Sequence, residues 1–144
     1  MITGRVDDDF GNPVASVDLD LVDAVAGDPV FTNHDTSDLS GTFNVVVPTG
    51  VYHIEFEPSL PTGLVPIRME SVSVAADLPL GVVVLAHGVH LSGDLRAPDG
   101  SAVQDAMVRA FEAATGREIV TIRNRTDAAG HFYFLVAPGD YDLR

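Results

Sequence analysis

Histidine and aspartate are the residues of this sequence whose side chains could act as bases or metal ligands. The histidines are His34, His53, His87, His90 and His131. His87 and His90 are three residues apart in a segment expected to be extended, so they face opposite sides of a strand and do not share a metal. A Ser-His-Asp triad needs a strained nucleophile turn such as Gly-x-Ser-x-Gly, and the sequence has none.

A second candidate group consists of aspartates that β-strand topology would bring to one pole of a fold. Alternate connections of a β-sandwich collect at the same end, which places five carboxylates near one another: Asp7, Asp8, Asp9, Asp35 and Asp38. Carboxylate oxygens are preferred ligands of Ca²⁺, so a calcium ion could stiffen this pole. The alternative is a solvated acidic rim, since no EF-hand spacing is present. The sequence leaves both interpretations open.

Composition removes several classes of function. The formal net charge is -13, and all eight basic residues are arginine. An acidic field repels phosphate backbones and anionic lipid, so nucleic acid and membrane insertion are not expected. The absence of lysine and cysteine excludes Schiff bases, Lys isopeptide crosslinks, disulfides and thiolate catalysis. We therefore assign no catalytic, cofactor-binding or metal-binding residue, expect no cofactor, and predict that the chain is not an enzyme.

One pattern of residues occurs twice in the chain. Shifting the sequence by 89 positions superposes Gly4 on Gly93 without any gap. The same shift aligns Gly11 with Gly100, Val14 with Val103, Gly27 with Gly116, Asp38 with Asp127, Gly41 with Gly130, Phe43 with Phe132, Gly50 with Gly139, and Tyr52 with Tyr141. Matches concentrated at glycines, where backbone geometry is special, predict two copies of one unit.

Hydrophobic residues in the first copy alternate with a period of two. Val17, Leu19 and Leu21 alternate with polar residues, which is typical of a strand with one buried face. The pattern predicts strands at 1–7, 14–23, 29–35, 42–48, 51–57, 65–74 and 81–87, with a bulge near Met69 to Val72 in the sixth. Residues 103–116 come closest to a helical pattern, but their alignment with 14–23 favours a strand. The predicted fold is all-β.

The Asp, Pro and Gly residues of the repeated motif occupy positions that favour β-turns. Asp at the first position and Gly at the fourth indicate type I turns at Asp38–Gly41 and Asp127–Gly130. Pro138 and Gly139 suit the centre of a type II turn that reverses the chain before Tyr141. These residues are predicted to have a structural role.

The segments "ITGRVDDDFGNPVASVDLDL" and "TSDLSGTFNVVVPTGVYHIEF" resemble the carboxypeptidase regulatory-like family, a transthyretin-like (prealbumin-like) sandwich. "LSGDLRAPDGSAVQDAMVRAF" and "TDAAGHFYFLVAPGDYDL" carry the same resemblance, which spans the chain except for residues 58–88. It implies tandem seven-stranded Greek-key β-sandwiches, prealbumin-like or Ig-like, of a generally non-catalytic kind. Enzymes on this fold use a two-Tyr, two-His iron site or a C-terminal Tyr-Arg-Gly-Ser motif. The motif is absent, and Tyr52 and Tyr141 lie in separate copies.

We expect residues 1–87 to form a complete β-sandwich domain. Residues 88–144 are expected to form a second domain of the same family that lacks its last two strands, the counterparts of 65–74 and 81–87. The missing strands should leave apolar surface and an open sheet edge, so the second domain should be less stable than the first or should associate through that edge.

The repeat and the missing catalytic motifs favour a spacer or adhesion-type module of a larger secreted or cell-surface protein. Its partners would be other domains of the same chain, and protein or carbohydrate ligands. The alternatives are an accessory domain of a multidomain enzyme, such as a peptidase or glycoside hydrolase, or a calcium-stiffened carbohydrate- or protein-binding module. Tyr133 and Phe111 are the aromatic residues predicted on an outer face, where a sugar would stack.

Overall fold

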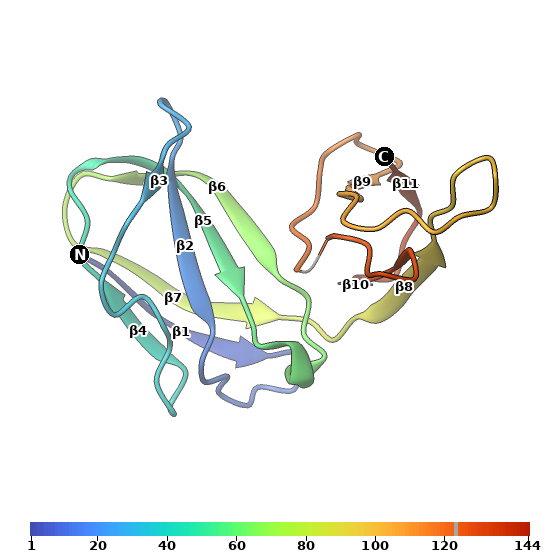
Figure 1. The fold of residues 1–144 in the computed structure, drawn as a ribbon. Helices are drawn as coiled ribbons and strands as arrows, with labels where there is room; N and C mark the ends of the chain where they lie inside the picture. Colours follow the sequence, from blue (N-terminus) through green and yellow to red (C-terminus); the bar gives the residue numbers. More distant parts are fainter. Residues whose placement is uncertain (123) are drawn as a thin grey trace. The chain divides into compact units, whose positions relative to one another are not determined.

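A computed structural model of the chain describes residues 1–122 and 124–144. These residues form two compact units, Met1–His87 (unit 1) and Gly88–Arg144 (unit 2), which are described separately below. Figure 1 shows that both are built from strands, with a single short 3-10 turn, Leu60–Thr62, among the described residues. The all-β prediction is confirmed.

Unit 1 has two sheets (Figure 1). In the first, β1 (Ile2–Asp8) lies between β4 (Thr42–Val45), which is antiparallel to it, and β7 (Leu78–Leu85), which is parallel. The second sheet has the order β3-β2-β5-β6, with β3 at Pro29–Val30, β2 at Asp18–Asp23, β5 at Gly50–Glu57 and β6 at Ile67–Val74.

Several strand boundaries differ from the predicted ones for identifiable reasons. The second strand begins at Asp18 rather than at residue 14, because Ser16 has a left-handed φ of 58° that interrupts the extended backbone. The third strand shrinks from 29–35 to Pro29–Val30, and His34 has φ 59°. The fourth ends at Val45, and the seventh begins earlier than expected, at Leu78.

The core of unit 1 is built from the inward side chains of the two sheets. Leu19 and Leu21 of β2 are buried while Asp18 and Asp20 are exposed, which confirms the period of two. Phe43 and Phe56 meet edge to face with ring centroids 5.7 Å apart. The predicted bulge in β6 is confirmed: the register shifts between the pairs Tyr52–Val72 and Ile54–Met69, and Ser71 has φ 54°.

Unit 2 contains β8 (Val89–Asp94), β9 (Ala110–Glu112), β10 (His131–Val136) and β11 (Tyr141–Leu143). β10 pairs with β8 in the register that β4 takes on β1, because Phe132 opposes Gly93 as Phe43 opposes Gly4. β11 pairs with β9 as β5 pairs with β2, with Leu143 opposite Ala110 and Ile54 opposite Leu21. Residues 103–116 contain no helix, as predicted.

The same polar contacts close the loops of both units. Ser37 Oγ accepts from the backbone N–H of Val17 and donates to the carbonyl of Val14, at 2.9 Å in each case. Thr126 Oγ1 takes the equivalent position between Ala106, at 3.0 Å, and Val103, at 2.7 Å. Both hydroxyls are buried, so the buried backbone groups of these loops find partners without water.

The two predicted type I turns are present, and the predicted type II turn is wrong. Asp38 Oδ1 accepts from the N–H groups of Ser40 and Thr42, at 2.8 and 2.9 Å, and Asp127 makes the equivalent bonds to Ala129 and His131. Gly139 does not have the positive φ that the centre of a type II turn requires. The Tyr141 hydroxyl instead fixes this corner by donating to the carbonyl of Ala137 at 2.7 Å, as Tyr52 does to Pro48 at 2.9 Å.

Unit 2 buries less of its apolar surface than unit 1. Val6 is 0% exposed, whereas Leu95, at the equivalent position, is 37% exposed. Ile54 and Leu143 differ in the same way, at 0% and 41%. In unit 1, β6 and β7 add partly buried side chains such as Ile67, Val72 and Leu78 to the core.

Replacing Gly41 by alanine should cost about 3 kcal/mol or more of unfolding free energy, measured by guanidinium denaturation. Gly41 has φ 73°, and an added Cβ would lie 2.3 Å from the carbonyl oxygen of Val6. Gly11→Ala is the matched control, because Gly11 has φ 84° with nothing within 4 Å of the added atom. It should cost only the left-handed strain, about 1 kcal/mol. Equal losses would contradict this account.

Hydrogen exchange should be slower in unit 1 than in unit 2, because local opening costs more where more apolar contacts must be broken. The amides of Val6 and Leu95 form a matched pair, since each donates at 2.8 Å to the carbonyl of the equivalent glycine, Gly41 or Gly130. We expect the Leu95 amide to exchange at least about tenfold faster in a monomeric sample. Equal protection would mean that unit 2 closes its core in another way.

Candidate functional site

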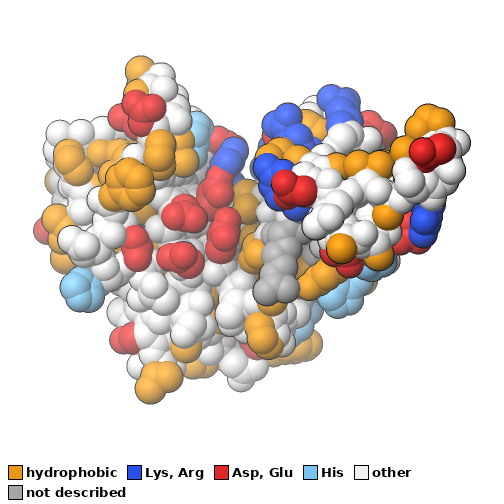
Figure 2. Space-filling model, in the orientation of Figure 1, with side chains coloured by type: hydrophobic (Ala, Val, Ile, Leu, Met, Phe, Trp, Pro, Cys, Tyr) orange, Lys and Arg blue, Asp and Glu red, His pale blue; other side chains and the backbone are white. Residues whose placement is uncertain are grey.

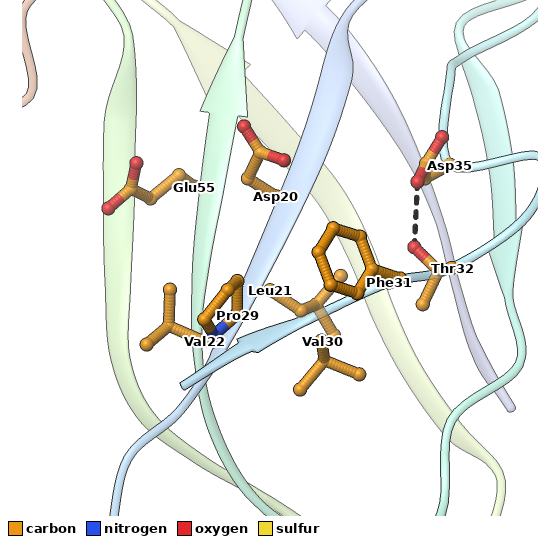
Figure 3. A pocket seen from close by; sticks show the side chains of 9 residues that line it. All are labelled: Asp20, Leu21, Val22, Pro29, Val30, Phe31, Thr32, Asp35 and Glu55. Carbon is orange, nitrogen blue, oxygen red and sulfur yellow. Dashed lines mark hydrogen bonds between the residues drawn. The ribbon is translucent and has the colours of Figure 1, made fainter. Parts of the chain in front are cut away.

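A pocket of about 320 Å³ lies on unit 1 beside the outward face of the second sheet. Its lining comes from β2, β3, the residues that follow β3, and Glu55 of β5 (Figure 3). Val22, Pro29 and Val30 supply apolar surface, and Asp20, Asp35 and Glu55 supply carboxylates. Phe31, at the pocket, is 94% exposed. The pocket thus combines an exposed aromatic ring with three acidic groups.

Strand pairing positions these carboxylates. Asp18 and Asp20 point outward because the leucines between and after them point into the core. β5 runs antiparallel to β2, so Glu57 lies directly opposite Asp18, and Glu55 directly opposite Asp20. We call these four residues the acidic face. Like charges directly opposite one another on a sheet repel, so this face costs the fold stability.

Burial and mutual repulsion change the proton affinity of the acidic face. The pKa of Asp20 is raised by partial desolvation and by the nearby charges of Glu55 and Asp35. Desolvation and neighbouring carboxylates likewise raise the pKa of Asp18 and of Glu57. The only basic group paired with the face among the described residues is Arg68, whose Nε donates to Glu55 Oε1 at 2.6 Å. Acidic side chains therefore dominate this part of the surface, as Figure 2 shows.

The arrangement has the chemistry of a cation-binding surface. A guanidinium or ammonium group would find carboxylate acceptors together with the face of Phe31, which attracts cations through its quadrupole. Asp35 is held in position because Thr32 Oγ1 donates to it at 2.7 Å (Figure 3).

The five aspartates considered as calcium ligands are not brought together. Among the described residues, no three His, Cys, Asp or Glu side chains are placed to hold one metal ion. Asp8 closes its own loop by accepting from the N–H groups of Phe10 and Asn12, and Asp38 caps its turn. Asp9 pairs with His87, Asp7 is buried beside Arg5, and Asp35 accepts from Thr32.

Three of the histidines lie beside three different carboxylates rather than together in one site. His53 Nδ1 lies 2.5 Å from Glu70, and His131 Nδ1 lies 3.2 Å from Asp94. The ring of His90 is 6.2 Å from that of Tyr133. His87 Nδ1 is 2.5 Å from Asp9 Oδ1, and its ring also meets that of Phe10.

The aromatic residues differ in part from the sequence prediction. Tyr133 is exposed as predicted, but Phe111 is only 9% exposed because the guanidinium groups of Arg109 and Arg144 lie over its ring, at 5.5 and 4.4 Å from the centroid. Phe31 and Phe10 are the exposed phenylalanine rings of unit 1, and neither was predicted from the sequence. The short β3 was not foreseen, and it is what leaves Phe31 outside a strand.

Comparisons with known proteins found likenesses in structure alone. No family model matches the chain, and no curated protein matches it. A mutant cohesin–X-dockerin complex of Acetivibrio cellulolyticus matches 60% of this chain at 17% identity and a TM-score of 0.44. The TIE protein of Bacillus anthracis matches 99% at 17% identity and 0.43, and a streptococcal ancillary pilin matches 99% at 14% identity and 0.44. This chain spans 57%, 27% and 51% of those three chains, respectively.

No helix in residues 1–122 and 124–144 is long and apolar enough to cross a membrane.

Replacing Asp20 by asparagine should stabilise unit 1 at pH 7 by about 0.2–1 kcal/mol, because it removes one member of an opposed like-charge pair. The raised pKa values mean that the folded state binds protons more readily than the unfolded chain. The cost of the acidic face is therefore present at neutral pH and disappears as the pH falls through the raised pKa values toward the ordinary one, about 4.

The gain from Asp20→Asn should accordingly shrink as the pH approaches 4, as followed by urea denaturation at several pH values. Asp28→Asn is the control, since it removes one exposed carboxylate that is not among the charges raising the pKa values of the acidic face. A gain that is the same for both variants, or that does not depend on pH, would contradict the electrostatic explanation.

Proposed function

We propose that this chain is a non-catalytic structural module, made of two copies of one β-sandwich unit, within a larger secreted or cell-surface protein. The support comes from the shared register of the paired strands, the shared hydroxyl contacts of Ser37 and Thr126, and the shared tyrosine corners. Polar side chains of both units are engaged in holding loops, as in the turns of Asp38 and Asp127. Such a module separates or displays the other domains of its chain.

The observation that carries the proposal is the parallel pairing of β1 with β7. Ile2 pairs with Leu78 and Asp8 with Leu85, so the start of β1 and the end of β7 lie at opposite ends of the strand pair. Tension that enters at Met1 and leaves at His87 would pull these strands along their length in opposite directions. The ladder bonds would then bear the force together rather than one after another. This geometry suits a unit that transmits force.

Single-molecule pulling tests the proposal. Because the chain has no cysteine, a single introduced cysteine gives a unique attachment point. We expect unit 1 to unfold at a severalfold higher force when pulled between the N-terminus and Ala86→Cys than between the N-terminus and Val46→Cys. Residues 46 and 86 are both exposed and both follow a strand that pairs with β1.

The two attachment points load strand pairs of opposite direction, since β4 is antiparallel to β1 and β7 is parallel to it. Val45 lies opposite Ile2 in the antiparallel β1–β4 pair, so pulling at residue 46 opens that pair from one end and breaks its bonds in sequence. Equal unfolding forces would remove the support for a force-transmitting role. Turnover of peptide, ester or glycoside substrates by the purified chain would contradict the non-catalytic assignment.

The acidic face and its pocket favour a second function, the binding of a cationic protein surface. An accessory domain in a multidomain enzyme such as a peptidase or glycoside hydrolase would use such a surface to hold a neighbouring domain. The pulling experiment does not depend on this second function.

A further inference from the structure

The two units differ strongly in charge. Residues 1–87 contain 13 of the 21 acidic residues but only Arg5 and Arg68 as basic ones. Six of the eight arginines lie after residue 88. Figure 2 shows acidic side chains gathered on the drawn face of unit 1 and, separately, arginines gathered on the drawn face of unit 2. This asymmetry is not required by the shared fold, because both units close their loops with the same turns.

The difference in charge is largest at equivalent positions on the outward face of the sheet that contains β2 and β5 in unit 1, and β9 and β11 in unit 2. The shift of 89 positions places Arg109 at the position of Asp20, and Arg144 at the position of Glu55. Asp20 lies directly opposite Glu55. Arg109 and Arg144 likewise oppose one another, since each donates its backbone N–H to the carbonyl of the other, at 2.7 and 2.9 Å. A pair of acids in unit 1 is thus replaced by a pair of arginines in unit 2.

Both arginine side chains contact neighbouring groups of unit 2. Both guanidinium groups lie over the ring of Phe111, and the Arg109 side chain is also held by Glu118, with Nε 2.7 Å from Oε1. We call Arg109, Phe111 and Arg144 the arginine face. Arginine is well suited to such a surface, because its planar guanidinium can stack on an aromatic ring and still donate to carboxylates at its edge.

We propose that copies of this chain associate head to tail, the acidic face of unit 1 on one molecule binding the arginine face of unit 2 on the next. The guanidinium of Arg144 enters the pocket beside Asp20 and Phe31. There the carboxylates accept from it, and the ring of Phe31 covers it. The contact joins two different surfaces, so each molecule keeps one free acidic face and one free arginine face, and association continues into a chain or closes into a ring.

Each face places like charges opposite one another, and contact with the other face would offset that repulsion. An opposed pair of like charges destabilises a sheet when it stands alone. The pKa of Asp20 is raised by partial desolvation and by the charges of Glu55 and Asp35, and a bound guanidinium would offset the repulsion between these carboxylates. This inference goes beyond the proposed structural role, and its test is separate, because pulling measures single molecules whereas association requires several.

Sedimentation velocity over a range of concentrations tests the inference on the whole chain. We expect association at low salt that weakens as ionic strength rises. Asp20→Arg and Arg144→Glu should each weaken association about tenfold or more, because each places like charges in contact. The chain that carries both substitutions should recover affinity to within about threefold of the original, since the charges are exchanged and again attract.

Two variants with the same change of charge elsewhere serve as controls. Asp77→Arg replaces an exposed carboxylate in the β6–β7 connection, and Arg96→Glu replaces an exposed arginine of unit 2. Neither should weaken association about tenfold. The thermal melt of every variant shows that it is folded. The proposal is overturned if the chain is monomeric at low salt and high concentration, if the controls weaken association as much as Asp20→Arg does, or if the double substitution fails to restore it.

Discussion

The backbone of β1 must be paired along both edges, and the arrangement of unit 1 follows from that requirement. β4 takes one edge in antiparallel register and β7 takes the other in parallel register. Both approach closely at Gly4, where an added Cβ would lie 2.6 Å from the ring of Phe43 and 2.9 Å from the carbonyl oxygen of Gly81. Gly93 and Phe132 repeat the ring contact at 2.8 Å in unit 2. Glycine lets the aromatic ring cross the strand and reach the core.

Features that depend on neighbouring residues could be predicted from the sequence. The period of two in β2 and the Asp–Gly turns are local, and both are confirmed in the structure. The prediction of a type II turn at Pro138–Gly139 was wrong. The Tyr141 hydroxyl fixes that corner by a hydrogen bond to Ala137, and turn propensities do not include such a contact. The third strand ends at Val30, although alternation alone favoured residues 29–35. Asn33, His34 and Asp35 are residue types that favour turns, and His34 adopts a left-handed φ of 59°, so this local signal was outweighed by the apolar pattern.

The candidate site could be predicted only in part, because it depends on which strands lie side by side. The alternation showed that Asp20 and Glu55 point outward, but only the pairing of β2 with β5 makes them neighbours. The interpretation of five aspartates as calcium ligands is not supported, because the described carboxylates do not gather around a common point. Asp8 and Asp38 accept from N–H groups of their own loops, and Asp9 pairs with His87, so these carboxylates have separate partners instead of a shared ion.

The pairing of β1 with β7 also has a consequence for synthesis on the ribosome. It joins the first strand of unit 1 to its last, so the sheet is completed only after Leu78–Leu85 has emerged from the exit tunnel. Bringing such distant segments together is entropically costly, and folds dominated by long-range contacts form slowly. Until then, one edge of β1 lacks its backbone partners and is open to pairing with other nascent chains. The strand that completes unit 1 is thus also the one that ends its exposure to misassembly.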